Sequence, residues 1–456
     1  MSLVPKIFFI AICLFSLVFT SWHVLHGNIE FSADIGRDFH LLQEIDAKKI
    51  ILIGPRSSSG LFHGPVWLYL NYPAYIIGQG NPLIVGWFWV VLSLAFVVSN
   101  FFIAKNLFGK LSAYFFTAAT AVYMGFHSMG LFNPHGAMFL LPFFFFCFIK
   151  YLRTQKLSFL LLHLISGGLI LQFQLAIGIP LLILSVAFLL VFFIRSGKRA
   201  HVLSLLLLPV FISNFILFDL RHEFLYANKM LSFINTQESG HTFNYLTLIP
   251  DRLATAFMKM EILRHDPYTY LNFAFFISML VLMIVLIRQN KYKDVYLSFF
   301  YFYFGFFLLS FINKGSLLYF YYFPFFPLIF LMLASFVSTK YKQYVIVPLV
   351  IILVINCLNG INDMRFFSQR RETDTHSWKF FNKATEKMFL GDEEEFGYFV
   401  FSPDVVAYEG RYAMLYAAKT HNKTVYSFTK RPVTYLFIAP TPPNEYVTGD
   451  AYWKKQ

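Results

Sequence analysis

The chain has 456 residues, of which 57% are hydrophobic and only 13% are charged. Soluble proteins carry roughly 25% charged residues, so this composition excludes an ordinary soluble domain and indicates a multi-pass membrane protein. The net charge of +13 does not indicate nucleic acid as a partner. The Lys and Arg residues recur in small groups between apolar segments, which is the pattern of cytoplasmic loops rather than of a nucleic-acid-binding patch.

Eleven apolar segments have a length close to that of a membrane-spanning helix. The first follows Lys6 and has no small-residue cleavage site after it, so we expect a retained span rather than a cleaved signal peptide. The stretch 157–194 allows either two short helices or one kinked helix. The Phe-rich run 142–148 is typical of a helix that faces lipid. The predicted spans are 7–20, 83–104, 111–129, 135–152, 157–174, 176–194, 201–218, 271–288, 295–312, 319–338 and 343–357.

The number of spans and the basic residues predict the same sidedness. Lys6 places the N-terminus in the cytoplasm, and an odd number of spans then places the C-terminus outside. The small basic groups all fall in cytoplasmic loops in this arrangement. Two long loops, 27–82 and 219–270, lie on the non-cytoplasmic side together with the polar tail. We therefore expect a multi-pass protein of the cell membrane whose active site faces away from the cytoplasm.

The polar tail predicts a second, smaller domain. It alternates a helical pattern at 377–389 with strand-like runs at 396–402 and 433–440. We expect residues 1–358 to form an all-α transmembrane catalytic domain and residues 359–456 to form a small extracytoplasmic α/β domain.

The first external loop holds the most informative polar residues. Read as a helix, 34–48 has one apolar face, and its other face carries Asp34, Arg37 and Asp38. Such a helix lies on the membrane surface, and carboxylates in that position usually mark function. The alternative is that Asp34 caps the helix and that Arg37 and Asp38 are simply solvated. The predicted apolar stripe consists of Ile35, Phe39, Leu42 and Ile45.

This loop resembles the GT-C membrane glycosyltransferases. The stretch "DIGRDF" followed by "GLFHGPVWLYL" is similar to the branch that contains the protein O-mannosyltransferases and the lipid A aminoarabinose transferase. In that branch an acidic pair opens the first loop, and its first Asp is the catalytic base. Asp34 matches that position, but Ile35 replaces the second acidic residue, and Asp38 offers a carboxylate one turn later. His63 before Gly64-Pro65 matches a Lys or His that precedes a Pro in the family.

The resemblance implies transfer of a sugar from a polyprenyl-phosphate donor to a hydroxyl of a lipid, glycan or protein. Asp34 and Asp38 are then the catalytic candidates. A cation stabilises the leaving phosphate, because guanidinium and ammonium groups pair with phosphate oxygens. Arg221 at the end of a predicted span is the first candidate for that role. The predicted substrate-binding residues are Arg37, Arg56, His63, Arg221, His222 and Lys314.

Two alternatives remain open from the sequence. The first is a polysaccharide ligase or polymerase, which would use Arg and His in a late external loop such as 219–270. The second is a flippase or transporter of lipid-linked sugars, which would place ionisable residues inside the spans. No His and Cys cluster predicts a bound metal, so we expect no cofactor, although a divalent cation is compatible with the family.

Overall fold

The computed structural model describes residues 3–57, 60–235, 245–264, 267–313, 318–368, 376–402 and 406–438. The described residues are mostly helical and end in a small sheet. The helices are α1 Leu3–Leu25, α2 Ala33–Lys48, α3 Val66–Ile77, α4 Pro82–Phe108, α5 Lys110–His127, α6 Asn133–Thr154, α7 Leu157–Phe173, α8 Leu175–Arg195, α9 Leu208–Arg221, α10 Leu225–Asn235, α11 Tyr245–Leu253, α12 Thr269–Arg288, α13 Lys293–Leu309, α14 Phe326–Ser335, α15 Lys342–Ser368, α16 Trp378–Phe389 and α17 Tyr408–His421. The strands are β1 Glu395–Phe401, β2 Thr424–Ser427 and β3 Thr434–Ile438.

Helices form at all eleven predicted spans, and the chain is a multi-pass membrane protein. Within the described ranges, nine helical segments are long and apolar enough to cross a membrane. The other two predicted spans are α5, which carries several hydroxyl residues, and α7, which has 17 residues. Both pack against other helices over much of their surface. Inner helices tolerate shorter and more polar sequences because protein rather than lipid surrounds them.

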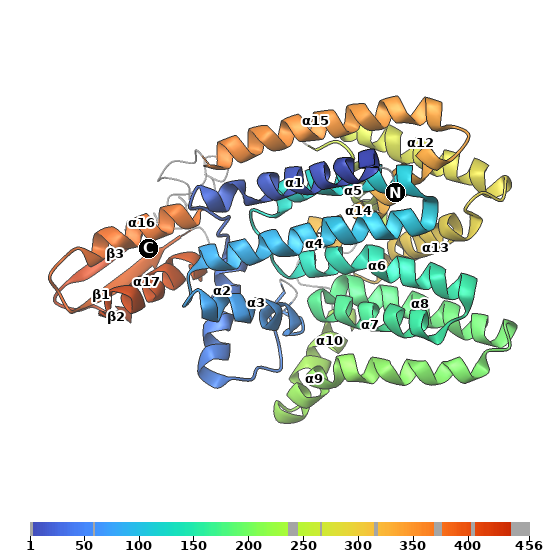
Figure 1. Ribbon diagram of the computed structural model, residues 1–456. Helices are drawn as coiled ribbons and strands as arrows, with labels where there is room; N and C mark the ends of the chain where they lie inside the picture. The colour runs from blue at the N-terminus through green and yellow to red at the C-terminus, as the bar shows by residue number, and fades with distance from the viewer. Residues whose placement is uncertain are drawn as a thin grey trace.

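The spans lie side by side, and the two ends of the bundle differ (Figure 1). One end carries α2, α3 and the C-terminal α/β unit. The other end carries the predicted cytoplasmic loops, where Arg153 Nε lies 2.6 Å from Asp294 Oδ2 and joins α6 to α13. The basic groups thus lie together at the end opposite α2, as the sequence predicts.

The stretch 157–194 forms two helices with a one-residue break. Gln174 has an extended backbone (φ −149°, ψ 103°) that ends α7 and begins α8. The two helices then pack closely, and a Cβ on Gly178 would lie 2.1 Å from the Cα of Leu171. The glycine therefore permits the tight turn that brings Gln174 to the α2 end of the bundle.

Most of the Phe-rich run 142–148 packs inside the protein and only Phe143 and Phe146 are partly exposed, which corrects the prediction from composition. Phe144, Phe145 and Phe148 are buried between α6 and its neighbours. The physical reason is that apolar helix faces pack equally well against lipid and against other helices, so composition alone does not distinguish the two.

The C-terminal unit is α/β, as predicted. Its three strands are parallel in the order β2-β1-β3, and α17 connects β1 to β2. The helices α16 and α17 pack on each other, and α17 also packs on α2. Figure 1 places the whole unit beyond the α2 end of the bundle.

The C-terminal unit holds the apolar face of α2. The rings of Phe39 and Tyr412 lie 5.0 Å apart, and the Tyr412 hydroxyl donates a 2.7 Å hydrogen bond to the carbonyl of Gly80. The backbones of α2 and α17 approach so closely at Gly36 that a Cβ there would lie 2.9 Å from the Glu409 nitrogen. The helix α2 is thus fixed from both sides, by the membrane bundle and by the C-terminal unit.

The sidedness of the molecule is directly testable. In a variant without the native cysteines, we expect Lys49→Cys and Lys430→Cys to react with a membrane-impermeant maleimide on intact cells. Lys198→Cys, on the opposite end of the bundle, should react only after permeabilisation. All three positions are exposed, so access to reagent is comparable. Labelling of Lys49→Cys and Lys198→Cys from the same side would contradict the topology.

Candidate active site

The surface helix α2 has the two faces that the sequence predicts. Its apolar stripe is buried, with Ile35, Phe39, Leu42 and Ile45 each at most 2% exposed. Asp34 does not cap the helix, because Ser32 occupies the N-cap position. Asp34 instead lies in the first helical turn, where the partial positive charge of the helix N-terminus stabilises a carboxylate.

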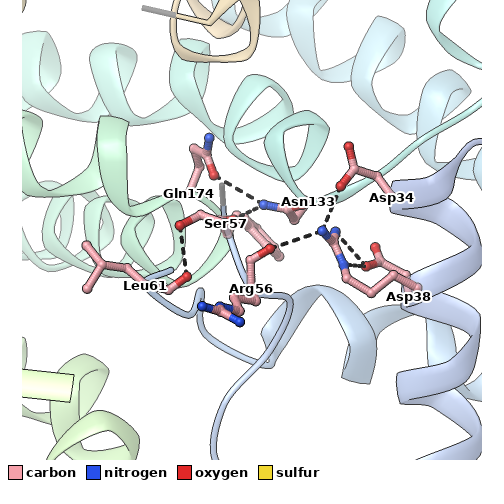
Figure 2. A network of polar contacts seen from close by, with 9 residues as sticks. Asp34, Asp38, Arg56, Ser57, Leu61, Asn133 and Gln174 are labelled. Atoms are coloured by element: carbon pink, nitrogen blue, oxygen red, sulfur yellow. Dashed lines mark hydrogen bonds and ion pairs between the residues drawn. The ribbon is translucent and has the colours of Figure 1, made fainter. Parts of the chain in front are cut away.

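Arg37 joins the two carboxylates of α2, Asp34 and Asp38, which are both labelled in Figure 2. Its Nη1 lies 2.6 Å from Asp34 Oδ1, and its Nη2 lies 3.1 Å from Asp38 Oδ1. The same Nη1 also donates a 3.1 Å hydrogen bond to the carbonyl of Arg56. Arg37 is therefore an ion-pair partner for both aspartates and a tie between α2 and the following loop.

The two carboxylates differ in exposure. The Asp34 side chain is 42% exposed, whereas that of Asp38 is only 7% exposed. Burial raises the pKa of Asp38 to about 7, and the charge of Arg37 only partly offsets this effect. The second oxygen of Asp38 is sealed from solvent without a hydrogen-bond partner. Asp34 is thus the carboxylate that a substrate can reach, and Asp38 is the carboxylate behind it.

The loop after α2 brings His63 to the same place. The loop folds back on itself, because the Gly54 nitrogen donates to the His63 carbonyl at 2.8 Å. The His63 Nδ1 accepts a 3.4 Å hydrogen bond from the Leu175 nitrogen, so the neutral ring carries its proton on Nε2. Burial, reinforced by the nearby positive charge of Arg37, lowers the pKa of His63 to about 3. His63 is therefore an uncharged donor at neutral pH.

These groups line a cavity of about 140 Å³ at the α2 end of the bundle. The cavity brings together Asp34, Arg37, Arg56 and His63 of the predicted site. It also has an aromatic side formed by Phe132 and by the segment before α14. The lining residues are Asp34, Arg37, Arg56, Ser57, His63, Phe132, Asn133, Pro134, Gln174, Leu318, Phe320 and Tyr321.

Two buried amides complete the cavity, and sequence reasoning missed both. Asn133 begins α6, and its Nδ2 donates to the Phe173 carbonyl at 2.9 Å and to Gln174 Oε1 at 3.2 Å. Figure 2 shows this pair across the cavity from Asp34. The signal in the sequence was the uncertain helix break at 157–194, because a polar residue at a break between two spans can face a polar cavity.

The remaining predicted residues are placed elsewhere. Arg221 and His222 are exposed at the end of α9 and do not line the cavity. Their neighbour Asp219 has a structural role, because its side chain accepts hydrogen bonds from the backbone nitrogens of Tyr226 and Ala227 at the start of α10. Lys314 lies outside the described residues.

Within the described part of the chain, no three His, Cys, Asp or Glu side chains come together as a metal site. Arg56 lines the cavity, and Figure 2 shows its guanidinium pointing away from the two aspartates. The polar side chains that line the cavity are therefore the accessible carboxylate of Asp34, the guanidinium groups of Arg37 and Arg56, and several uncharged hydrogen-bonding groups.

The fold is similar to that of two kinds of solved membrane protein. ArnT from Cupriavidus metallidurans bound to undecaprenyl phosphate matches with a TM-score of 0.56 at 13% identity, over 94% of this chain and 90% of that one. The apo state of the same protein gives a TM-score of 0.55 at 11% identity, over 92% and 89%. An oligosaccharyltransferase from Archaeoglobus fulgidus in its apo form gives 0.53 at 11% identity, over 93% and 65%.

These similarities define the fold of the protein. The chain has the GT-C fold, as the resemblance of its first loop predicts. At 10–13% identity the similarity concerns the fold alone. No protein-family model and no curated protein matches the sequence.

The buried carboxyl of Asp38 makes stability depend on pH. Its pKa is 3.8 in its ordinary state and about 7 in the fold, so between these values the unfolded chain releases a proton that the folded chain keeps. Stability therefore falls as the pH rises from about 4 to 7. We expect the Tm of the wild type, relative to that of Asp38→Asn, to decrease over this range. Asp294→Asn, at the other end of the bundle, is the control, and equal Tm profiles for wild type and Asp38→Asn would contradict the assignment.

Proposed function

We propose that the chain is a membrane glycosyltransferase that moves a sugar from a polyprenyl-phosphate donor to an acceptor hydroxyl on the non-cytoplasmic face. The observation that carries the proposal is the half-exposed carboxylate of Asp34, held by Arg37 at a cavity on the α2 end of the bundle. The GT-C fold supports the same class of reaction. One structure with this fold is that of ArnT bound to undecaprenyl phosphate.

Asp34 acts as the general base in this reaction. The acceptor hydroxyl loses its proton to Asp34 as its oxygen forms a bond to the anomeric carbon of the sugar. The bond between that carbon and the phosphate oxygen breaks, and the lipid phosphate leaves with the electron pair. Arg37 orients Asp34 through their 2.6 Å ion pair. Asp38 acts through Arg37, which it holds from the buried side.

Arg56 is the proposed ligand of the donor phosphate. It is exposed, lies at the edge of the cavity, and its guanidinium is turned away from the aspartates that would otherwise neutralise it. A guanidinium fits two phosphate oxygens at once and stabilises the charge of the leaving group. We propose that the reaction needs no bound metal, and inclusion of EDTA in the assay tests this.

The flippase alternative predicts that the donor remains intact. A transporter would move the lipid-linked sugar without breaking its glycosidic bond. Mass spectrometry of the donor after incubation distinguishes the two, because only a transferase or a ligase releases free polyprenyl phosphate. The ligase alternative differs in its acceptor, a preformed polysaccharide, and the same analysis of products identifies it.

Removal of the base should nearly abolish transfer. We expect Asp34→Asn to lower turnover of a polyprenyl-phosphate sugar by about 10²–10⁴-fold without unfolding the protein, because a general base contributes a factor of this size. Asp38→Asn should cost less, below about 100-fold, because Asp38 only positions Arg37. The assay measures polyprenyl phosphate released with an envelope lipid and glycan extract as acceptor. Near-normal turnover by Asp34→Asn would exclude it as the base.

Substitution of two exposed arginines, Arg56 and Arg221, identifies the residue that binds the donor phosphate. Arg56→Ala should raise the donor KM by about 10–100-fold, since it removes a charge-assisted hydrogen bond worth about 1.5–3 kcal/mol. Arg56→Lys should recover part of this loss. Arg221→Ala removes an equally exposed arginine that does not line the cavity, and its KM should be unchanged. The opposite result, an effect at Arg221 and none at Arg56, would restore the assignment that the sequence alone predicts.

A further inference from the structure

One part of the cavity wall is polar but uncharged. It is formed by His63 from the first loop, Asn133 from the start of α6 and Gln174 from the break between α7 and α8. All three side chains are buried, at 7%, 3% and 2% exposure. Three separate elements thus bring neutral hydrogen-bonding groups to one small cavity.

Each of these side chains uses one polar atom within the protein. Nδ1 of His63, Nδ2 of Asn133 and Oε1 of Gln174 have the hydrogen bonds described above. Their other polar atoms are His63 Nε2, Asn133 Oδ1 and Gln174 Nε2. Within the described ranges these three atoms have no hydrogen-bond partner in the protein. They also differ from the buried unpaired atoms of the structure, because solvent can reach them. They therefore remain available on the cavity side as two donors and one acceptor.

The side chains of this wall carry no charge of their own, and Arg37 beside them already has two ion-pair partners. Arg37 contacts both Asp34 and Asp38, so neither its guanidinium nor Asp38 offers a free counter-ion to a substrate. An ammonium or carboxylate group placed directly against His63, Asn133 and Gln174 would lose its hydration without gaining a partner of opposite charge from these three side chains, which is costly. Hydroxyl groups both donate and accept, and they satisfy two donors and one acceptor without that cost.

We propose that His63, Asn133 and Gln174 form the sugar subsite and that the donor carries an uncharged, hydroxyl-bearing pentose or hexose rather than an amino sugar or a uronic acid. This inference rests on the proposed glycosyltransferase function and names the class of sugar. Gln174 is the specificity-determining position, because its amide nitrogen is the only part of that side chain left for the substrate.

The substitution Gln174→Glu tests this proposal, because it gives the neutral wall one negative charge. Gln174→Glu keeps an oxygen that accepts from Asn133 Nδ2 and replaces the free amide nitrogen with a carboxylate oxygen. Binding is measured on the full chain in nanodiscs, without acceptor, by competition in native mass spectrometry. The probes are undecaprenyl phosphate, its glucosyl, mannosyl and arabinofuranosyl esters, its glucuronosyl ester and its 4-amino-4-deoxyarabinosyl ester.

The wild type should bind at least one neutral ester more tightly than both charged esters and than bare undecaprenyl phosphate. Gln174→Glu should shift the ratio of amino-sugar to neutral-sugar affinity by about 10–100-fold toward the amino sugar, the size of a charge-assisted hydrogen bond. Its affinity for bare undecaprenyl phosphate should be unchanged. Gln174→Met should weaken neutral-sugar binding with no gain for the amino sugar, which keeps the test decisive if the Glu variant misfolds.

Gln289→Glu is the matched control for net charge, because Gln289 bonds Tyr341 at the opposite end of the bundle. It should behave as the wild type. Equal binding of neutral and charged esters by the wild type, or an unchanged ratio in a folded Gln174→Glu, overturns the sugar subsite alone if undecaprenyl phosphate still binds. Failure of every undecaprenyl compound to bind overturns the proposed function together with it.

Discussion

The candidate site depends on the pairing of one guanidinium with two carboxylates on a helix at the membrane surface. A buried carboxylate such as Asp38 is costly unless a cation lies beside it. Arg37 supplies that cation and at the same time bonds Asp34 and the carbonyl of Arg56. The position of the accessible carboxylate is thus determined by a buried ion pair behind it, which leaves little freedom for the helix to rotate.

The pairing of Arg37 with Asp34 and Asp38 also depends on the packing of the C-terminal unit on α2. The bundle lies on one side of the helix, and the C-terminal unit packs on the other through Phe39, Gly36 and Tyr412. Without that unit, Phe39 would lose the ring of Tyr412, and this side of α2 would face water or lipid headgroups. The C-terminal α/β unit therefore contributes to the site although none of its described residues lines the cavity.

The sequence predicted those parts of the structure that are set by local periodicity. The spans follow from apolar length, and the cluster of Asp34, Arg37 and Asp38 follows from helical spacing, which places residues three and four apart on one face. Asn133 and Gln174 were not predictable in this way, because a break between two spans and the start of a third bring them together. Arg221 was assigned from its position at a helix end, and only the structure shows that the cavity lies elsewhere. The prediction that the Phe-rich run 142–148 faces lipid was wrong for a related reason. Hydrophobicity does not distinguish between lipid and another helix as the neighbour.

The two aspartates show how burial assigns different roles to identical groups. Asp38 lies against Arg37 but is sealed from the cavity, so it cannot reach an acceptor hydroxyl, and its raised pKa would leave it partly protonated at neutral pH. Asp34 is in the first turn of α2, half-exposed and open to the cavity. A base has to be accessible to the acceptor hydroxyl, and of the two aspartates only Asp34 is. The fold therefore leaves one carboxylate open to the cavity, and the buried carboxylate holds the arginine between them.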